Sequence, residues 1–160
     1  MKLPRDKREF ALFLIIISLI SVNVIAPAIS FCEAGLSADT YFGALAIMPA
    51  VWAAVVAVVL LTHRPAEWLA RKTVRERDGF RAAIAKNTAC TVLLISIAMT
   101  VIGAWIAMGS VDPGAIEAFP YRWPRNFAIA LCVELFLAQP VARMAVERLH
   151  LRRDARAGAA

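Results

Sequence analysis

A single acidic side chain, Glu134, lies in the middle of an apolar segment that reads NFAIALCVELFLAQPVA over residues 126–142. An ionisable group near the centre of a bilayer costs on the order of 2.5–3.5 kcal/mol on insertion scales, so it is usually turned inward and partnered. Glu134 is therefore either a proton- or cation-coupling site or a neutral, hydrogen-bonded side chain that holds helices together. Gln139 and Arg143 are not at helical spacing from it, so its partner must come from another helix or subunit.

Small polar side chains mark two further apolar segments. Ser18, Ser21 and Asn23 lie in the first, and Ser96 and Thr100 lie in the third. Side chains three or four residues apart share a helix face, and small hydroxyl residues let membrane helices approach closely and bond across the contact. The spacing predicts a hydrogen-bonded seam between these two helices, with packing favoured over a substrate path.

The residues that could bind a metal or react are not arranged for either role. His63 and His150 have no acidic or cysteine neighbours at ligand spacing, so we expect them at the membrane interface and predict no metal site. Cys32, Cys90 and Cys132 form no C-x-x-C pair. One isolated carboxyl group without suitable partners does not make an active site. The sequence predicts no enzyme activity, no catalytic residue and no cofactor.

These polar residues must be positioned by four apolar blocks. Hydrophobic residues make up 61% and charged residues 19% of the 160-residue chain, against roughly half and a quarter in ordinary globular proteins. A transmembrane helix needs about 20 predominantly apolar residues. The sequence predicts an all-α integral membrane protein with four transmembrane helices, over residues Phe10–Phe31, Tyr41–Thr62, Ala85–Met108 and Asn126–Ala142. The fourth is the shortest and most polar.

The distribution of basic residues orients these helices. Of the 18 Lys and Arg residues, only Arg122 and Arg125 lie in the connections that follow the first and third helices. The others lie in the N-terminal segment, the middle connection with the start of the third helix, and the C-terminal tail. Basic residues are retained on the cytoplasmic side during insertion. Both termini are therefore predicted to be cytoplasmic, and the net charge of +6 is interpreted as a topology signal, with no nucleic acid as a partner.

The N-terminal segment could instead be a cleaved signal peptide, because a basic stretch and an apolar run precede Ala26-Pro27-Ala28. The apolar run is longer than a usual signal core, and Asp6 and Glu9 interrupt the basic stretch. A transmembrane helix is favoured, and the later helices keep their orientation in either case.

The two halves of the chain resemble each other. Pro49 is followed sixteen residues later by Pro65, and Pro124 is followed at the same interval by Pro140. Similar small, apolar and basic residues come next, in AEWLARK and VARMAVER, and ISLI at residues 17–20 matches ISIA at residues 95–98. The pattern predicts two parallel-repeat helical hairpins related by a pseudo-two-fold axis along the membrane normal. Val59 takes the place of Glu134 in the first half.

The serine-containing first helix and the proline-bounded second helix with its basic extension resemble the bacterial membrane proteins grouped as domain-of-unknown-function family 2798. The resemblance covers about residues 8–150 in two tandem copies. It implies a hairpin repeat of the inner membrane and supplies no activity or functional residues. The expected parts are a cytoplasmic N-terminus (1–9), a first hairpin with its basic segment (10–81), a second hairpin (82–150) and a disordered basic tail (151–160).

Two functions are compatible with this architecture. The favoured one is a small structural or interaction protein of the bacterial inner membrane that packs as a helical bundle or homo-oligomer. The alternative is a small transporter or channel with Glu134 as its proton- or cation-coupling site. The expected partners are the lipid bilayer and anionic lipids at the cytoplasmic face, where the segment PAEWLARKTVRERDGFR combines Trp68 and Leu69 with positive charges typical of an interfacial helix.

Overall fold

Long helices follow from the four apolar blocks. The computed structural model describes residues 7–74 and 79–157, and in it α1 covers Lys7–Ala34, α2 covers Ala38–Thr73 and α3 covers Phe80–Met108. After the single turn α4 (Gly114–Glu117), α5 (Phe119–Val133), the π-helical segment η1 (Glu134–Ala138) and α6 (Gln139–Ala157) follow one another directly. We call α5, η1 and α6 together the fourth helix. The described residues contain no strand, and the prediction of an all-α fold is confirmed.

Each helix is longer than the apolar block that predicts it, and the fourth differs most. Its part that is long and apolar enough to cross a membrane runs from Phe119 to Leu151, whereas the sequence predicts Asn126–Ala142. Arg122, Arg125 and Pro124, which suggest a boundary in the sequence, lie inside the helix. The predicted disordered tail from residue 151 is wrong as far as Ala157, because the Arg and Ala residues there favour helix.

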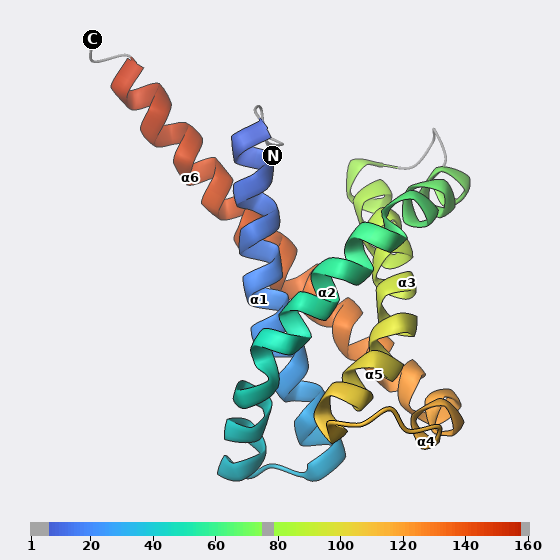
Figure 1. The fold of residues 1–160 in the computed structure, drawn as a ribbon. Coiled ribbons are helices and arrows are strands. Elements are labelled where there is room, and N and C mark those ends of the chain that lie inside the picture. The colour runs from blue at the N-terminus through green and yellow to red at the C-terminus, as the bar shows by residue number, and fades with distance from the viewer. Residues whose placement is uncertain (1–6, 75–78, 158–160) are drawn as a thin grey trace.

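Two glycines with positive φ end the first and third helices. Gly35, with φ 85°, follows α1 and donates its N–H to the Phe31 carbonyl at 3.0 Å. Ser37 then caps α2, because its Oγ accepts the Thr40 N–H at 3.0 Å. Gly109, with φ 67°, ends α3. Glycine adopts this left-handed conformation without steric cost, and both connections reverse the chain at the same end of the molecule (Figure 1).

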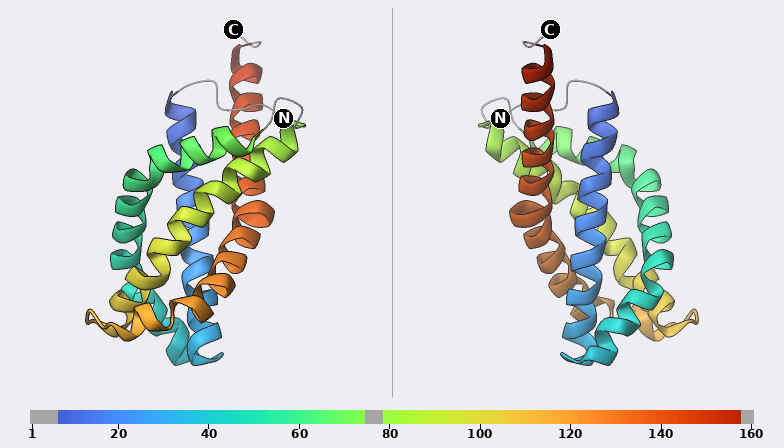
Figure 2. Two further views of the ribbon diagram at one scale, coloured as in Figure 1. Left: turned by 90° about the vertical axis from the view of Figure 1, so that its right-hand side faces the viewer. Right: turned by 90° about the vertical axis from the view of Figure 1, so that its left-hand side faces the viewer.

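The long helices form a closed ring. α2 packs against α1 and α3, and the fourth helix also packs against α1 and α3. Among the described residues α1 and α3 do not contact each other. One end of the ring contains the starts of α1 and α3 and the ends of α2 and α6. The connection between α1 and α2 lies at the opposite end (Figures 1 and 2). The predicted seam between the first and third helices is therefore wrong, because these helices are diagonal to each other.

Small residues bring the fourth helix close to α1. Ala138, Ala142, Val146 and His150 follow one another at intervals of four, and each is 0–3% exposed. Residues at this spacing share one helix face, and small side chains allow close approach of membrane helices. This stripe carries a titratable side chain at its end.

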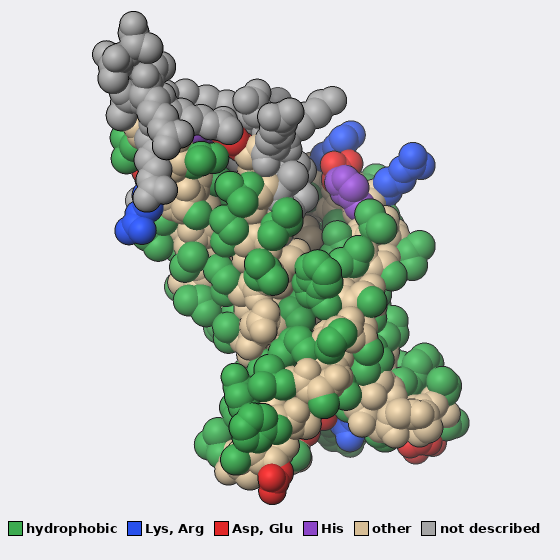
Figure 3. Space-filling model, turned by 60° about the vertical axis from the view of Figure 1, so that its left-hand side comes forward, with side chains coloured by type: hydrophobic (Ala, Val, Ile, Leu, Met, Phe, Trp, Pro, Cys, Tyr) green, Lys and Arg blue, Asp and Glu red, His purple; other side chains and the backbone are tan. Residues whose placement is uncertain are grey.

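The outer surface is apolar over its middle. Leu19, Phe42, Leu60, Phe136 and other large hydrophobic side chains are exposed, and Figure 3 shows hydrophobic side chains across the middle of one face with charged ones toward its two ends. In the described part of the chain, four helices have the length and hydropathy needed to cross a membrane. This distribution is that of a protein surrounded by lipid.

Candidate intramembrane polar site

Glu134 begins the π-helical segment η1 of the fourth helix. The segment ends two residues before Pro140, which has no N–H and whose ring would clash with the Phe136 carbonyl in a regular α-helix. The N–H of Gln139 instead donates to the Glu134 carbonyl, five residues earlier. The Leu135 carbonyl is left without a backbone donor, because its α-helical donor is used by Glu134 and its π-helical donor would be Pro140. Such π segments are frequent at functional sites.

The side chain of Glu134 is bonded to α1. Ser21 Oγ–H donates to Glu134 Oε1 at 2.5 Å, and Ser21 is 7% exposed. The partner of Glu134 thus comes from another helix, as the spacing of Gln139 and Arg143 requires. Arg143 instead donates to Gln139 at 3.1 Å. The contact between α1 and the fourth helix therefore contains a hydrogen-bonded carboxyl group half-way along its length.

The other two candidate residues of the first helix do not bond to Glu134. Asn23 is exposed and its Nδ2–H donates to the Leu19 carbonyl of its own helix at 2.7 Å. Ser18 is half-buried. Asn23 satisfies its amide locally, as polar side chains in a helix often do. Of the three polar residues predicted in α1, only Ser21 meets Glu134.

Ser96 and Thr100 of α3 face α5 instead of α1. Trp123 Nε1–H donates to Ser96 Oγ at 3.1 Å, and Asn126 Nδ2–H donates to Thr100 Oγ1 at 3.4 Å. Ser96, Thr100 and Asn126 are each 5–6% exposed. These hydroxyl groups do join helices, but within the second hairpin. The burial of Asn126 is not predicted from the sequence, because this residue stands at the edge of the predicted helix.

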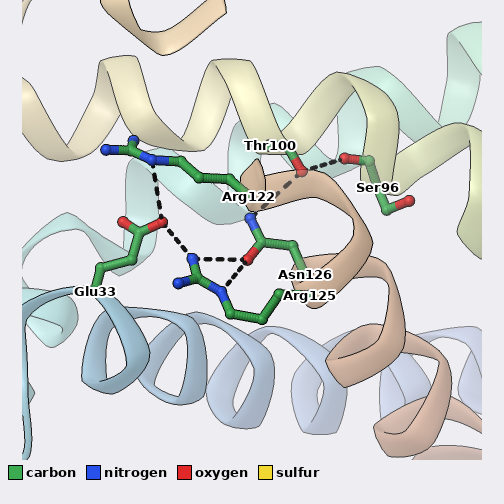
Figure 4. Close-up of polar contacts among 6 residues, drawn as sticks. All are labelled: Glu33, Ser96, Thr100, Arg122, Arg125 and Asn126. Atoms are coloured by element: carbon green, nitrogen blue, oxygen red, sulfur yellow. Dashed lines mark hydrogen bonds and ion pairs between the residues drawn. The ribbon is translucent and has the colours of Figure 1, made fainter. Parts of the chain in front are cut away.

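An ion pair continues this network to the end of α1 (Figure 4). The Arg125 guanidinium donates to Asn126 Oδ1 and, at 2.7 Å, to Glu33 Oε1. Arg122 Nε lies 3.9 Å from the same Glu33 oxygen. The side chains of Glu33 and the two arginines are about one third exposed, at 32% and 36%. Solvent screens such a pair, so its main consequence is to fix the start of α5 beside the end of α1.

The opposite end of the same contact contains a buried histidine and glutamate. His150 Nε2 and Glu9 Oε2 share a hydrogen bond at 2.6 Å, and their side chains are 3% and 2% exposed. His150 Nδ1 is buried without a hydrogen-bond partner. His150 is thus buried within the bundle at this end, whereas His63 is exposed, with 66% of its side chain accessible. The four-residue spacing from Ala138 through Ala142 and Val146 is the sequence signal that could have placed it.

The polar contacts thus occur at three heights along α1. Glu9, Ser21 and Glu33 are twelve residues apart, or about 18 Å on an α-helix. Each contacts a side chain of the fourth helix: His150, Glu134 and Arg125 respectively. The described residues contain no group of three or more His, Cys, Asp or Glu side chains that could hold a metal ion. This arrangement can hold two helices in one register.

Replacing Ser21 with alanine is expected to lower the free energy of unfolding by about 1 kcal/mol, because the Glu134 carboxyl group loses its donor inside the membrane. Ser18→Ala is the matched control, one turn away on the same helix, and should cost less than half as much. Reversible unfolding in mixed micelles, followed by circular dichroism during titration with sodium dodecyl sulfate, measures both. Equal losses from the two variants would contradict a stabilising Ser21–Glu134 bond.

These features define a multi-pass, all-α membrane protein with a polar contact between its first and last helices. Within this class, residues 82–150 match the family described as Domain of unknown function (DUF2798). The match covers one copy, from α3 through most of the fourth helix, and supports the family resemblance for the second half of the chain. No curated protein and no solved structure gave a significant match.

Proposed function

We propose that this chain is a structural or interaction protein of a bacterial inner membrane, with both termini in the cytoplasm and no enzymatic activity. The observation that carries the proposal is the Ser21–Glu134 bond. In this bond the intramembrane carboxyl group holds α1 and the fourth helix together. The contacts Glu9–His150 and Glu33–Arg125 tie the same two helices near their ends, so the polar residues of this contact are engaged in holding the bundle together.

Two tandem copies of one hairpin form part of this proposal. In the ring, α1 and α3 are diagonal, and so are α2 and the fourth helix, as a pseudo-two-fold axis through the centre would require. Pro49 and Pro65 lie inside α2 and Pro124 lies inside α5, in agreement with the repeat in the sequence. A second copy of the chain against the exposed apolar surface would extend the same packing into a homo-oligomer.

A second candidate function is proton- or cation-coupled transport at Glu134, which the π segment favours. Three oxygen atoms are available near the middle of the helices: those of the Glu134 carboxyl group, the Ser21 hydroxyl group and the Leu135 carbonyl, which lacks a backbone donor. Carbonyls freed by interrupted helices coordinate Na⁺ or accept protons in secondary transporters. The fold alone does not decide between the two functions.

Two substitutions at Glu134 separate these functions. Glu134→Gln keeps an oxygen that accepts from Ser21 but cannot release a proton, whereas Glu134→Ala removes both properties. A structural role predicts that the glutamine variant keeps its stability and oligomeric state and that the alanine variant loses about 1–2 kcal/mol or its oligomeric state. Unfolding titrations and multi-angle light scattering in detergent give these quantities.

Transport predicts a different result from the same proteins in liposomes. Proton-linked solute flux should be present for the original chain and absent for Glu134→Gln. Flux absent from both contradicts transport, whereas unchanged stability and assembly of Glu134→Ala contradict the structural role.

A further inference from the structure

The last part of α2 is longer than a membrane crossing requires. α2 has 36 residues, about 54 Å at 1.5 Å per residue, whereas the hydrocarbon core of a bilayer is about 30 Å thick. Pro65 lies within the excess. The final turns of α2, in bright green, run across the end of the bundle toward the start of α3 (Figure 2). We call residues 60–73 the α2 arm.

One face of the α2 arm is fixed against the bundle. Ala66 and Ala70 are 5% and 6% exposed, and they lie one turn apart on the same face. Cys90 Sγ–H of α3 points to Thr73 Oγ1 at 3.8 Å. The arm is therefore a fixed element with a defined outer face.

The outer face of the α2 arm combines large apolar side chains with positive charge. Leu60, Leu61 and Trp68 are 72%, 78% and 59% exposed. Arg64 and Lys72 lie one turn before and one turn after Trp68, and Lys72 Nζ lies 3.9 Å from the centre of the Trp68 ring. Figure 3 shows basic side chains and a histidine standing out from this end of the molecule.

Acidic side chains only partly balance this charge. Glu67 lies 3.9 Å from both His63 and Arg71, and the side chain of Arg71 is 83% exposed. The described arm has a positive net charge, because it contains three basic residues and one acidic residue: Arg64, Arg71, Lys72 and Glu67. A helix face exposed only to water would not be expected to combine leucine and tryptophan side chains with these cations.

We propose that the α2 arm lies in the headgroup layer of its leaflet and binds anionic lipids such as phosphatidylglycerol. Tryptophan is enriched at this depth of a bilayer, leucines beside it enter the acyl boundary, and arginine and lysine attract lipid phosphates. Each basic residue near the surface contributes about fivefold to the preference for anionic lipid. The proposal assigns the anionic lipids expected from the sequence to one helix face and does not depend on the role of Glu134.

Quenching of Trp68 by brominated lipid tests the proposal. The chain and its Trp68→Phe variant are placed in phosphatidylcholine vesicles that contain a small fraction of dibrominated phosphatidylglycerol or the same fraction of dibrominated phosphatidylcholine. The difference between the two proteins reports Trp68 alone. We expect quenching that indicates at least a fivefold enrichment of the anionic lipid around Trp68, weakened by salt. Equal quenching by the two brominated lipids would overturn the proposal.

Charge variants of the arm supply matched controls on one helix face. Arg64→Gln/Arg71→Gln/Lys72→Gln should abolish the preference for anionic lipid, and Glu67→Gln should increase it. All four side chains are exposed, so these variants should remain folded. A preference that persists in the triple variant would also overturn the proposal. Both leaflets of the vesicles carry the same lipids, so the result is independent of orientation.

Discussion

Replacing His150 with leucine is expected to destabilise the chain by about 2–4 kcal/mol, the largest effect we expect from one substitution. The replacement leaves Glu9, whose side chain is 2% exposed, without its 2.6 Å hydrogen bond. Removing one partner of a buried hydrogen bond or ion pair typically costs about 1–5 kcal/mol. The upper end of this range does not apply here because Glu9 makes a further interaction. Unfolding in mixed micelles measures the loss.

A second readout is local to the end of α6. Val146 and His150 are the last buried residues of the stripe that packs on α1. If their contact is weakened, the end of α6 should separate from α1 before the rest of the bundle unfolds. Limited trypsin digestion should then cut the leucine variant after Arg148 several times faster than the original chain. The matched control is His63→Leu, which changes an exposed histidine and should alter neither quantity.

Apolar replacement of both Glu9 and His150 tests whether their polar contact stabilises the bundle. His150 Nδ1 has no hydrogen-bond partner, so the pair is incompletely satisfied, and well-packed apolar replacements of such pairs are often neutral or stabilising. The double variant Glu9→Met/His150→Leu should therefore recover most of the stability lost by His150→Leu. A double-mutant cycle with a coupling energy near zero would show that the two side chains do not stabilise each other.

The helices could be predicted from the sequence because their apolar blocks are long, but the ends of the fourth helix could not. Arg122, Pro124 and Arg125 are typical of a connection between helices. In the structure Glu33 lies beside both arginines, and Pro124 does not interrupt the helix. A contact between residues 92 positions apart decides this boundary, and no local pattern contains it.

The polar residues of the candidate site could be predicted from the sequence, but the partner that each of them bonds to was less predictable. Glu134 and Ser21 were both recognisable, since polar groups in apolar helices need partners. Which helix supplies the partner depends on packing order. Apolar residues cover most sides of these helices. The sequence pattern therefore does not distinguish whether α1 packs against the fourth helix or against α3. Ser96 and Thr100 were assigned to the wrong neighbour for this reason.

Deleting Phe136 from the π segment is expected to leave the chain folded, whereas deleting Ala128 from α5 should prevent folding. A π segment contains one residue more than an α-helix of the same extent. Without Phe136, Gln139 stands four residues after Glu134, so the N–H and carbonyl that are bonded now form an ordinary α-helical bond. Phe136 is 78% exposed, and its loss removes little packing.

The control deletion acts through helix rotation. Ala128 is small and exposed, so its own side chain contributes little to packing. Each residue of an α-helix turns the chain by about 100°, so loss of Ala128 would turn Glu134 away from Ser21 and Ala142 and His150 away from α1.

Size-exclusion chromatography and circular dichroism in detergent compare the two deletions. We expect the Ala128 deletion to yield aggregated protein and the Phe136 deletion to elute as a single species with unchanged helicity. Failure of both deletions alike would contradict the interpretation of the π segment as a one-residue insertion.

The residual cost of deleting Phe136 should come from Pro140. In the shortened helix the proline ring meets the Leu135 carbonyl four residues before it, and a proline in a helix interior costs about 3 kcal/mol. Adding Pro140→Ala removes that clash, so the combined variant should be more stable than the deletion alone. If Pro140→Ala gives no recovery, relief of the proline clash is not the reason for the π segment, and a role of the freed carbonyl beside Glu134 becomes the better explanation.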